Sequence, residues 1–113
     1  METLLDFVQA DENFKLFVIN EMQLNPVVSV WTDETLALIL YSYADFIKKP
    51  YEVGEKIISK SDRFSYKYAT TVLKKRFILG EPTIKNSSYK SKYITFVQSI
   101  TSKENFFLFK LEF

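Results

Sequence analysis

The chain has no cysteine and no histidine among its 113 residues. Without cysteine it forms no disulfide and offers no thiolate nucleophile, which is compatible with a reducing, cytoplasmic environment. Without histidine it lacks the commonest general base and the commonest zinc ligand. These two absences argue against a zinc centre and against an enzyme built on the usual nucleophile and base pairs.

Glycine and proline are also scarce, with two and three residues. Two isolated glycines cannot build the phosphate-binding loop of a nucleotide-binding fold or a dinucleotide fingerprint. Carboxylate pairs remain, but Asp11–Glu12 and Asp33–Glu34 each fall at an expected helix start, where acids stabilise the helix dipole. We therefore expect no enzyme activity, no catalytic residue, no cofactor and no metal.

No apolar run approaches the 18 residues that a membrane span needs, and the first residues carry acids where a signal peptide is basic. We expect a single domain over residues 1–113, without a membrane-spanning segment and located in the cytoplasm. Scarce glycine and proline favour long regular elements. Aromatic residues make up 17% of the chain and can supply a core without disulfides or metal.

The chain also repeats itself. Gly54–Glu55 recurs 26 residues later as Gly80–Glu81, and Tyr43–Ala44 recurs after 25 residues as Tyr68–Ala69, with Tyr93 a further 25 along. A period of this length is typical of stacked supersecondary units, each of which buries its apolar face only against its neighbours. We expect the recurring tyrosines to occupy equivalent packing positions between layers.

Helical periodicity predicts long helices over about 33–49, 62–77 and 88–100, with short helices over about 51–59 and from Pro82 onward. Residues 2–9 and 12–22 are expected to form an N-terminal helical cap. The predicted fold is therefore mainly α, built from stacked short-helix and long-helix repeats. Gly80 lies just past a long helix, where we expect a left-handed backbone.

The C-terminus departs from this pattern. Phe107, Phe109, Leu111 and Phe113 alternate with other residues, which is the period of a strand. The sequence therefore predicts a small β-ribbon of 27–31 with 106–113. Whether this strand pairs within the chain or with another chain is left open.

The stretch 68–84 carries the tyrosine–alanine pair, then Val72–Lys74, Arg76–Phe77 and Gly80–Pro82, and ends at Ile84. It resembles a short helical repeat of bacteriophage-encoded proteins, most of which have no assigned function. The resemblance covers residues 60–90 well and the flanking units loosely, and Lys75 stands where the family usually has a small residue. It implies a viral origin and a helical scaffold, and it brings no active-site residue with it.

Charge is unevenly distributed, although the net charge is only +1. Residues 1–35 hold seven acidic residues and one basic residue, whereas residues 36–113 hold fourteen basic and seven acidic residues. Either the two parts of one fold complement each other, or a basic surface faces nucleic acid or an acidic partner.

Basic residues recur where two of the long helices end. There they stabilise the helix dipole, or they form a stripe that binds phosphates or an acidic protein, with exposed tyrosines as stacking platforms. The candidate partner-binding residues are Lys48, Lys49, Lys67, Lys74, Lys75, Arg76, Tyr66 and Tyr89.

A repeat scaffold without catalytic chemistry favours a small phage-type protein that binds and modulates a host or viral protein. Inhibition of that protein in the host cytoplasm, for example in anti-defence, is the expected outcome. The alternative is a nucleic-acid-binding module that uses the basic stripe, and a third interpretation is an assembly factor that pairs through the C-terminal strand. The sequence leaves the oligomeric state open.

Overall fold

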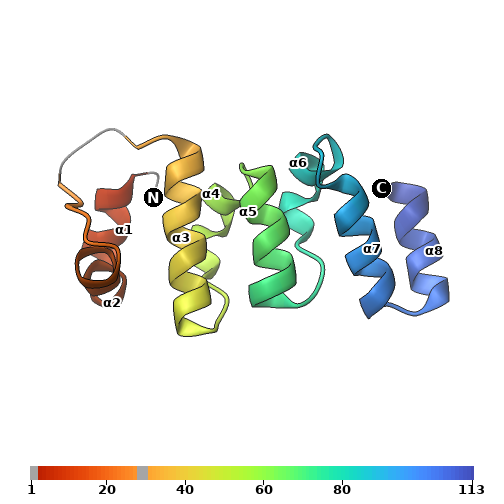
Figure 1. Ribbon diagram of the computed structural model, residues 1–113, viewed down its shortest axis with the longest axis horizontal. Coiled ribbons are helices and arrows are strands. Elements are labelled where there is room, and N and C mark those ends of the chain that lie inside the picture. The colour runs from red at the N-terminus through yellow and green to blue at the C-terminus, as the bar shows by residue number, and fades with distance from the viewer. Residues whose placement is uncertain (1–2, 28–30) are drawn as a thin grey trace.

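The helices stand side by side in a row that measures 47 × 24 × 19 Å (Figure 1). The computed structural model describes residues 3–27 and 31–113. The helices, two π-helical segments (η1 and η3) and two 3₁₀ turns (η2 and η4) are α1 (Leu4–Ala10), α2 (Glu12–Leu16), η1 (Phe17–Glu21), α3 (Asp33–Ile47), η2 (Glu52–Gly54), α4 (Glu55–Ile58), α5 (Asp62–Lys67), η3 (Tyr68–Leu73), η4 (Ile78–Gly80), α6 (Glu81–Lys85), α7 (Lys90–Ile100) and α8 (Lys103–Glu112).

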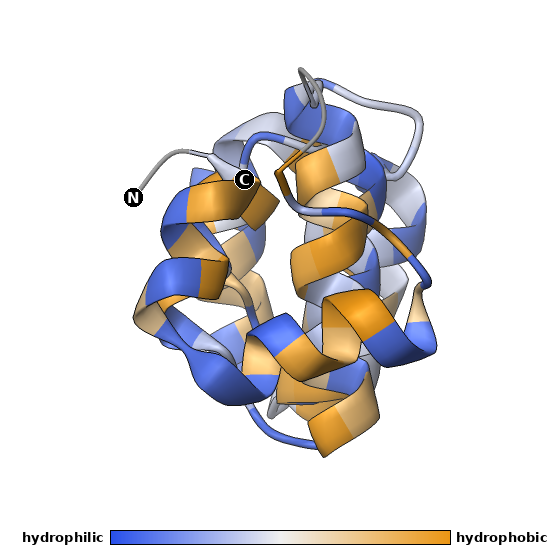
Figure 2. Ribbon diagram, turned by 90° about the vertical axis from the view of Figure 1, so that its left-hand side faces the viewer, coloured by the Kyte–Doolittle hydropathy of each residue, from blue (hydrophilic) through white to orange (hydrophobic). Residues whose placement is uncertain are grey.

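The prediction of a mainly helical fold is confirmed. The long helices α3, α5 with η3, and α7 alternate with the short elements η2–α4 and η4–α6. Viewed along the row, the helices form two columns whose hydrophobic positions turn toward each other (Figure 2). No helix in the described part of the chain is long and apolar enough to cross a membrane.

Polar side chains fix where the helices begin. Asp11, Thr32, Ser61 and Ser102 each accept a hydrogen bond from the backbone N–H three residues later. Each cap satisfies one of the helix-start N–H groups that have no partner within the helix. The helix starts are therefore written locally in the sequence.

The long helices end in a recurring left-handed residue, which is not a glycine. Gln23, Lys48 and Lys74 have φ of 55°, 57° and 54° and lie 25 and 26 residues apart. The helix formed by α2 and η1 therefore ends like the later long helices and is a repeat unit in its own right, where the sequence predicted only a cap.

The prediction of a left-handed backbone at Gly80 was wrong, since its φ is −89°, and Gly54 has a φ of −95°. Both glycines are needed for space. A Cβ at Gly80 would lie 2.6 Å from the Oγ of Ser65, and one at Gly54 would lie 3.1 Å from a methyl carbon of Leu40. Ser65 and Leu40 are 25 residues apart, so each short element crosses its preceding long helix at the same point.

The two spacings of the repeat have a structural cause. Tyr43 precedes the left-handed Lys48 by five residues, whereas Tyr68 precedes Lys74 by six. The extra residue lies within η3, where the backbone widens into a π-helix. A spacing of 25 before that point therefore becomes 26 after it.

The predicted C-terminal strand was wrong, because residues 103–112 form α8 and the described residues contain no strand. Ser102 caps α8, and Phe106, Phe109 and Phe113 face inward at helical spacing, the last two in ring contact with Tyr93. The same phenylalanines fit both periods over a few residues, so packing decided between them. Of the ribbon's other half, residues 28–30 lie outside the described residues.

Candidate functional site

The interior holds two copies of one hydrogen-bonded arrangement, which we call the tyrosine clamps. The hydroxyl of Tyr68 accepts the backbone N–H of Tyr51 at 2.9 Å and donates to a carboxylate oxygen of Glu55 at 2.6 Å. The hydroxyl of Tyr93 accepts the N–H of Phe77 at 3.0 Å and donates to Glu81 at 2.6 Å. Each clamp ties a long helix to the start of the short element before it.

The clamps keep their tyrosines protonated. Burial is the main cause that raises the pKa of Tyr68 and Tyr93 far above the ordinary value, and the bonded glutamate raises it further. Both side chains are completely buried. The most strongly perturbed groups thus have a structural role.

Arg76 belongs to the second clamp. Its Nε and Nη2 each donate to Glu81 at 2.7 Å, and its guanidinium lies 4.7 Å from the ring centre of Phe109. This bidentate contact is the main cause that raises the pKa of Arg76. The structure therefore uses this candidate residue to fasten α8 to the stack.

Four of the candidate lysines lie together. Lys48 and Lys49 follow α3, and Lys74 and Lys75 follow η3, in turns at the same edge of the row, the lower one in Figure 1. We call these four residues the lysine edge. Lys48 and Lys74 line one shallow depression of about 170 Å³ together with Asp45. Asp45 also forms an exposed ion pair with Lys48, at 3.3 Å.

The remaining candidates lie elsewhere. Tyr66 and Tyr89 are half-buried and contact each other with ring centres 5.4 Å apart. Tyr89 precedes α7 at the end of the stack opposite the lysine turns, and Lys67 lies over the ring of Phe64. The structure therefore brings the lysines together but does not place the two tyrosines beside them.

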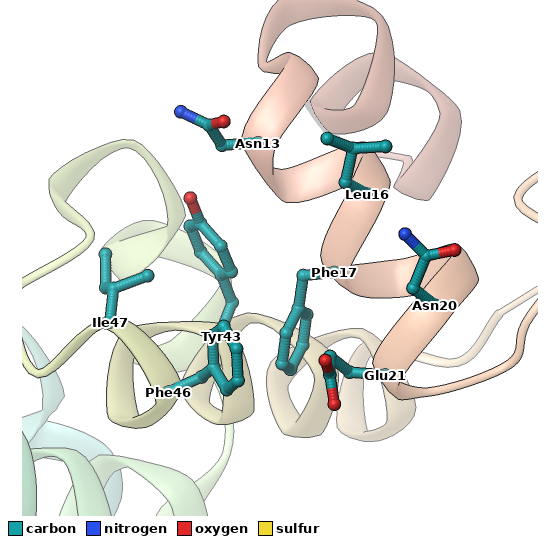
Figure 3. A pocket seen from close by; sticks show the side chains of 8 residues that line it. All are labelled: Asn13, Leu16, Phe17, Asn20, Glu21, Tyr43, Phe46 and Ile47. Atoms are coloured by element: carbon teal, nitrogen blue, oxygen red, sulfur yellow. The ribbon is translucent and has the colours of Figure 1, made fainter.

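A second surface feature is an open groove between the first two long helices (Figure 3). Its volume is about 340 Å³. We call it the N-terminal groove, and its lining residues are Asn13, Leu16, Phe17, Asn20, Glu21, Tyr43, Phe46 and Ile47.

Aromatic rings form the floor of the N-terminal groove. The ring of Phe17 lies 5.0 Å from that of Phe46 and 5.3 Å from that of Tyr43, measured between ring centres. Phe46 remains 56% exposed and Leu16 47% exposed, although both are large and apolar. Contiguous exposed apolar surface of this kind marks interaction sites in proteins.

Tyr43 lines the groove because it lacks a clamp. Counting three residues on from the left-handed positions, Pro26 stands where Tyr51 and Phe77 donate their N–H groups. Proline has no N–H. The hydroxyl of Tyr43 makes no hydrogen bond to the described residues. Burial, followed by the charge of Asp11, raises its pKa.

Sequence reasoning missed the N-terminal groove. Two signals pointed to it: Phe46, a large aromatic residue beside the buried stripe of its helix, and Pro26, which removes the donor that a tyrosine clamp requires. Neither signal is readable until the repeats are aligned by their left-handed residues.

Comparisons of the chain with protein-family models, curated proteins and solved structures found no match. The resemblance of residues 60–90 to a phage repeat thus stays a prediction. Within residues 3–27 and 31–113, no group of three or more acidic side chains is placed to hold a metal ion.

Proposed function

We propose that this chain is a non-enzymatic, phage-type scaffold protein that binds a host or viral protein stoichiometrically and thereby inhibits or redirects it. The host cytoplasm is the proposed place of action. The N-terminal groove is the observation that carries this proposal. Its walls are rigid helices, and its apolar floor is already formed without a ligand.

The groove has the features of a protein-binding site. Hot spots of protein interfaces are enriched in aromatic residues that sit in pockets near the centre of the contact. Phe46 and Tyr43 present such rings, and Phe17 fixes them from below. A preformed surface loses little conformational entropy on binding, so its contacts contribute more fully to affinity.

The proposal is tested by capture from bacterial lysate on the immobilised chain, with nuclease treatment and a salt wash. We expect one protein retained at stoichiometric yield by the wild-type chain. Co-purification on gel filtration gives the stoichiometry. Recovery of no protein near equimolar yield contradicts the proposal.

A second candidate function is nucleic-acid binding at the lysine edge. It is favoured by the two lysines that line one depression and by their two neighbours in the same turns. Affinity for single-stranded RNA or DNA should then fall steeply between about 50 and 200 mM salt. The double variant Lys48→Glu with Lys74→Glu should abolish binding and leave the circular dichroism spectrum unchanged.

A further inference from the structure

We infer that the N-terminal groove takes a cationic amphipathic helix of the partner protein. This inference rests on the proposed function and specifies its partner. It follows from the shape of the groove, from its charge, and from a contrast with the next groove along the stack.

The shape of the groove favours a helix. On one wall Asn13, Phe17 and Asn20 follow each other at helical spacing, and on the other wall Tyr43 and Ile47 do the same. Both walls therefore present ridges along a helix axis, into which the ridges of a third helix can pack. The described residues contain no strand, so an extended peptide finds no sheet edge to extend.

The charge of the groove favours a cationic ligand. Glu21 is the charged residue of the lining, is exposed, and makes no ion pair in the described part of the chain. Residues 1–35 around it hold seven acidic residues against Lys15 alone. A lysine or arginine on the docking helix meets this carboxylate, and the acidic surroundings steer a positive segment toward it.

The repeat itself supplies a contrast. The depression between α3 and η3 lies at the matching place one unit later, where Val72 stands 51 residues after Glu21. That depression is lined by Lys48 and Lys74 and has half the volume, about 170 Å³ against about 340 Å³. A cationic helix therefore discriminates between the two by charge and by size.

Polar groups at the rim allow orientation of the ligand. Asn13 and Asn20 contribute amide groups, and the hydroxyl of Tyr43, which no clamp occupies, is available as donor and acceptor. A few such polar groups around an apolar floor are typical of sites that hold a ligand in one orientation.

The test uses the full chain and two synthetic peptides that are capped at both ends. The first is an amphipathic helix with leucine at positions i, i+3, i+4 and i+7 and lysine elsewhere, and the second replaces every lysine by glutamate. Backbone amide shifts in ¹H–¹⁵N spectra locate the peptide, and calorimetry gives its affinity. We expect the lysine peptide to shift groove residues and the glutamate peptide to shift none.

Two variants and two matched controls follow. Phe46→Ala and Glu21→Lys should each weaken binding of the lysine peptide about tenfold. Phe107→Ala removes a similarly exposed ring from α8, and Glu112→Lys reverses a similarly exposed acid, so both should change the affinity less than about twofold.

Shifts centred on the lysine edge or on α8, equal binding of both peptides, or wild-type affinity in Phe46→Ala and Glu21→Lys would each overturn the inference. The proposed function fails separately. If lysate capture yields a partner that the two groove variants retain, the protein-binding function stands and this assignment of its surface falls. If capture yields nothing while the lysine peptide binds the groove as described, the reverse holds.

Discussion

Replacing the clamped tyrosines by phenylalanine measures what the clamps contribute to stability. Tyr68→Phe removes a hydroxyl that makes two hydrogen bonds and leaves the ring in place. The N–H of Tyr51 then loses its only acceptor in a buried position, and Glu55 loses a charge-assisted bond. An unsatisfied buried donor costs about 1–3 kcal/mol, and a hydrogen bond to a charged group contributes about 1.5–3 kcal/mol. We expect Tyr68→Phe to lower the free energy of unfolding by about 3 kcal/mol.

Tyr93→Phe removes the same two bonds from the second clamp. Its loss should be somewhat smaller, about 2 kcal/mol, because Arg76 continues to hold both oxygens of Glu81. Each kilocalorie per mole corresponds to about 4 °C in melting temperature for a chain of this size. The two variants should therefore melt about 12 °C and 8 °C below the wild-type chain.

Tyr43→Phe is the matched control. It removes the same atom at the same place in the repeat, but from a hydroxyl without a hydrogen bond to the described residues. Its stability should stay within about 0.5 kcal/mol of wild type. Urea titrations followed by far-ultraviolet circular dichroism compare the three variants. Equal destabilisation by all three substitutions, or none by Tyr68→Phe, would refute the role assigned to the clamps.

Three further predictions follow from the backbone and the buried hydroxyls. Gly80→Ala should destabilise by about 2–3 kcal/mol and Gly54→Ala by about 1 kcal/mol in thermal melts, because the added Cβ lies 2.6 Å from Ser65 in the first case and 3.1 Å from its nearest neighbour in the second. Lys48→Gly and Lys74→Gly should each raise the unfolding free energy by about 0.5 kcal/mol in urea titrations, because glycine relieves the cost of a left-handed residue and retains part of that gain against its own entropy. The raised pKa of both clamp tyrosines means that the unfolded chain loses their protons first; stability should hold up to about pH 10 and then fall by up to roughly 1.4 kcal/mol per pH unit for each, as pH-dependent urea midpoints would show. A stability that stays constant from pH 9 to 11.5 would contradict this linkage.

The repeat and the helical class were predictable because they rest on short-range signals. Capping residues, the stop at Pro50 and the apolar stripes act within a turn or two of the chain, so each helix start could be found locally. The match between Tyr68 and Tyr93 was also visible as spacing. Their shared surroundings then follow from the stacking of identical units.

The candidate site was predicted less well. The lysines of the lysine edge were found because they follow helix ends, which is a local signal. Arg76 carries the same charge in the same stretch, but Glu81 and Phe109 approach it from the next elements and remove it from the surface. No spacing in the sequence distinguishes a cation that stays in solvent from one that a neighbouring layer covers.

The sequence by itself determined that this chain forms capped helices in a repeating order, because hydrogen bonds within a turn and apolar spacing along one helix need no distant partner. Tertiary structure decided the rest. It made residues 103–112 a helix, since their phenylalanines gain more contact against Tyr93 than a lone strand could find. It also assigned the glycines to close helix crossings and opened the N-terminal groove where Pro26 removes a donor, because free space and unpaired groups exist only once neighbouring layers are in place.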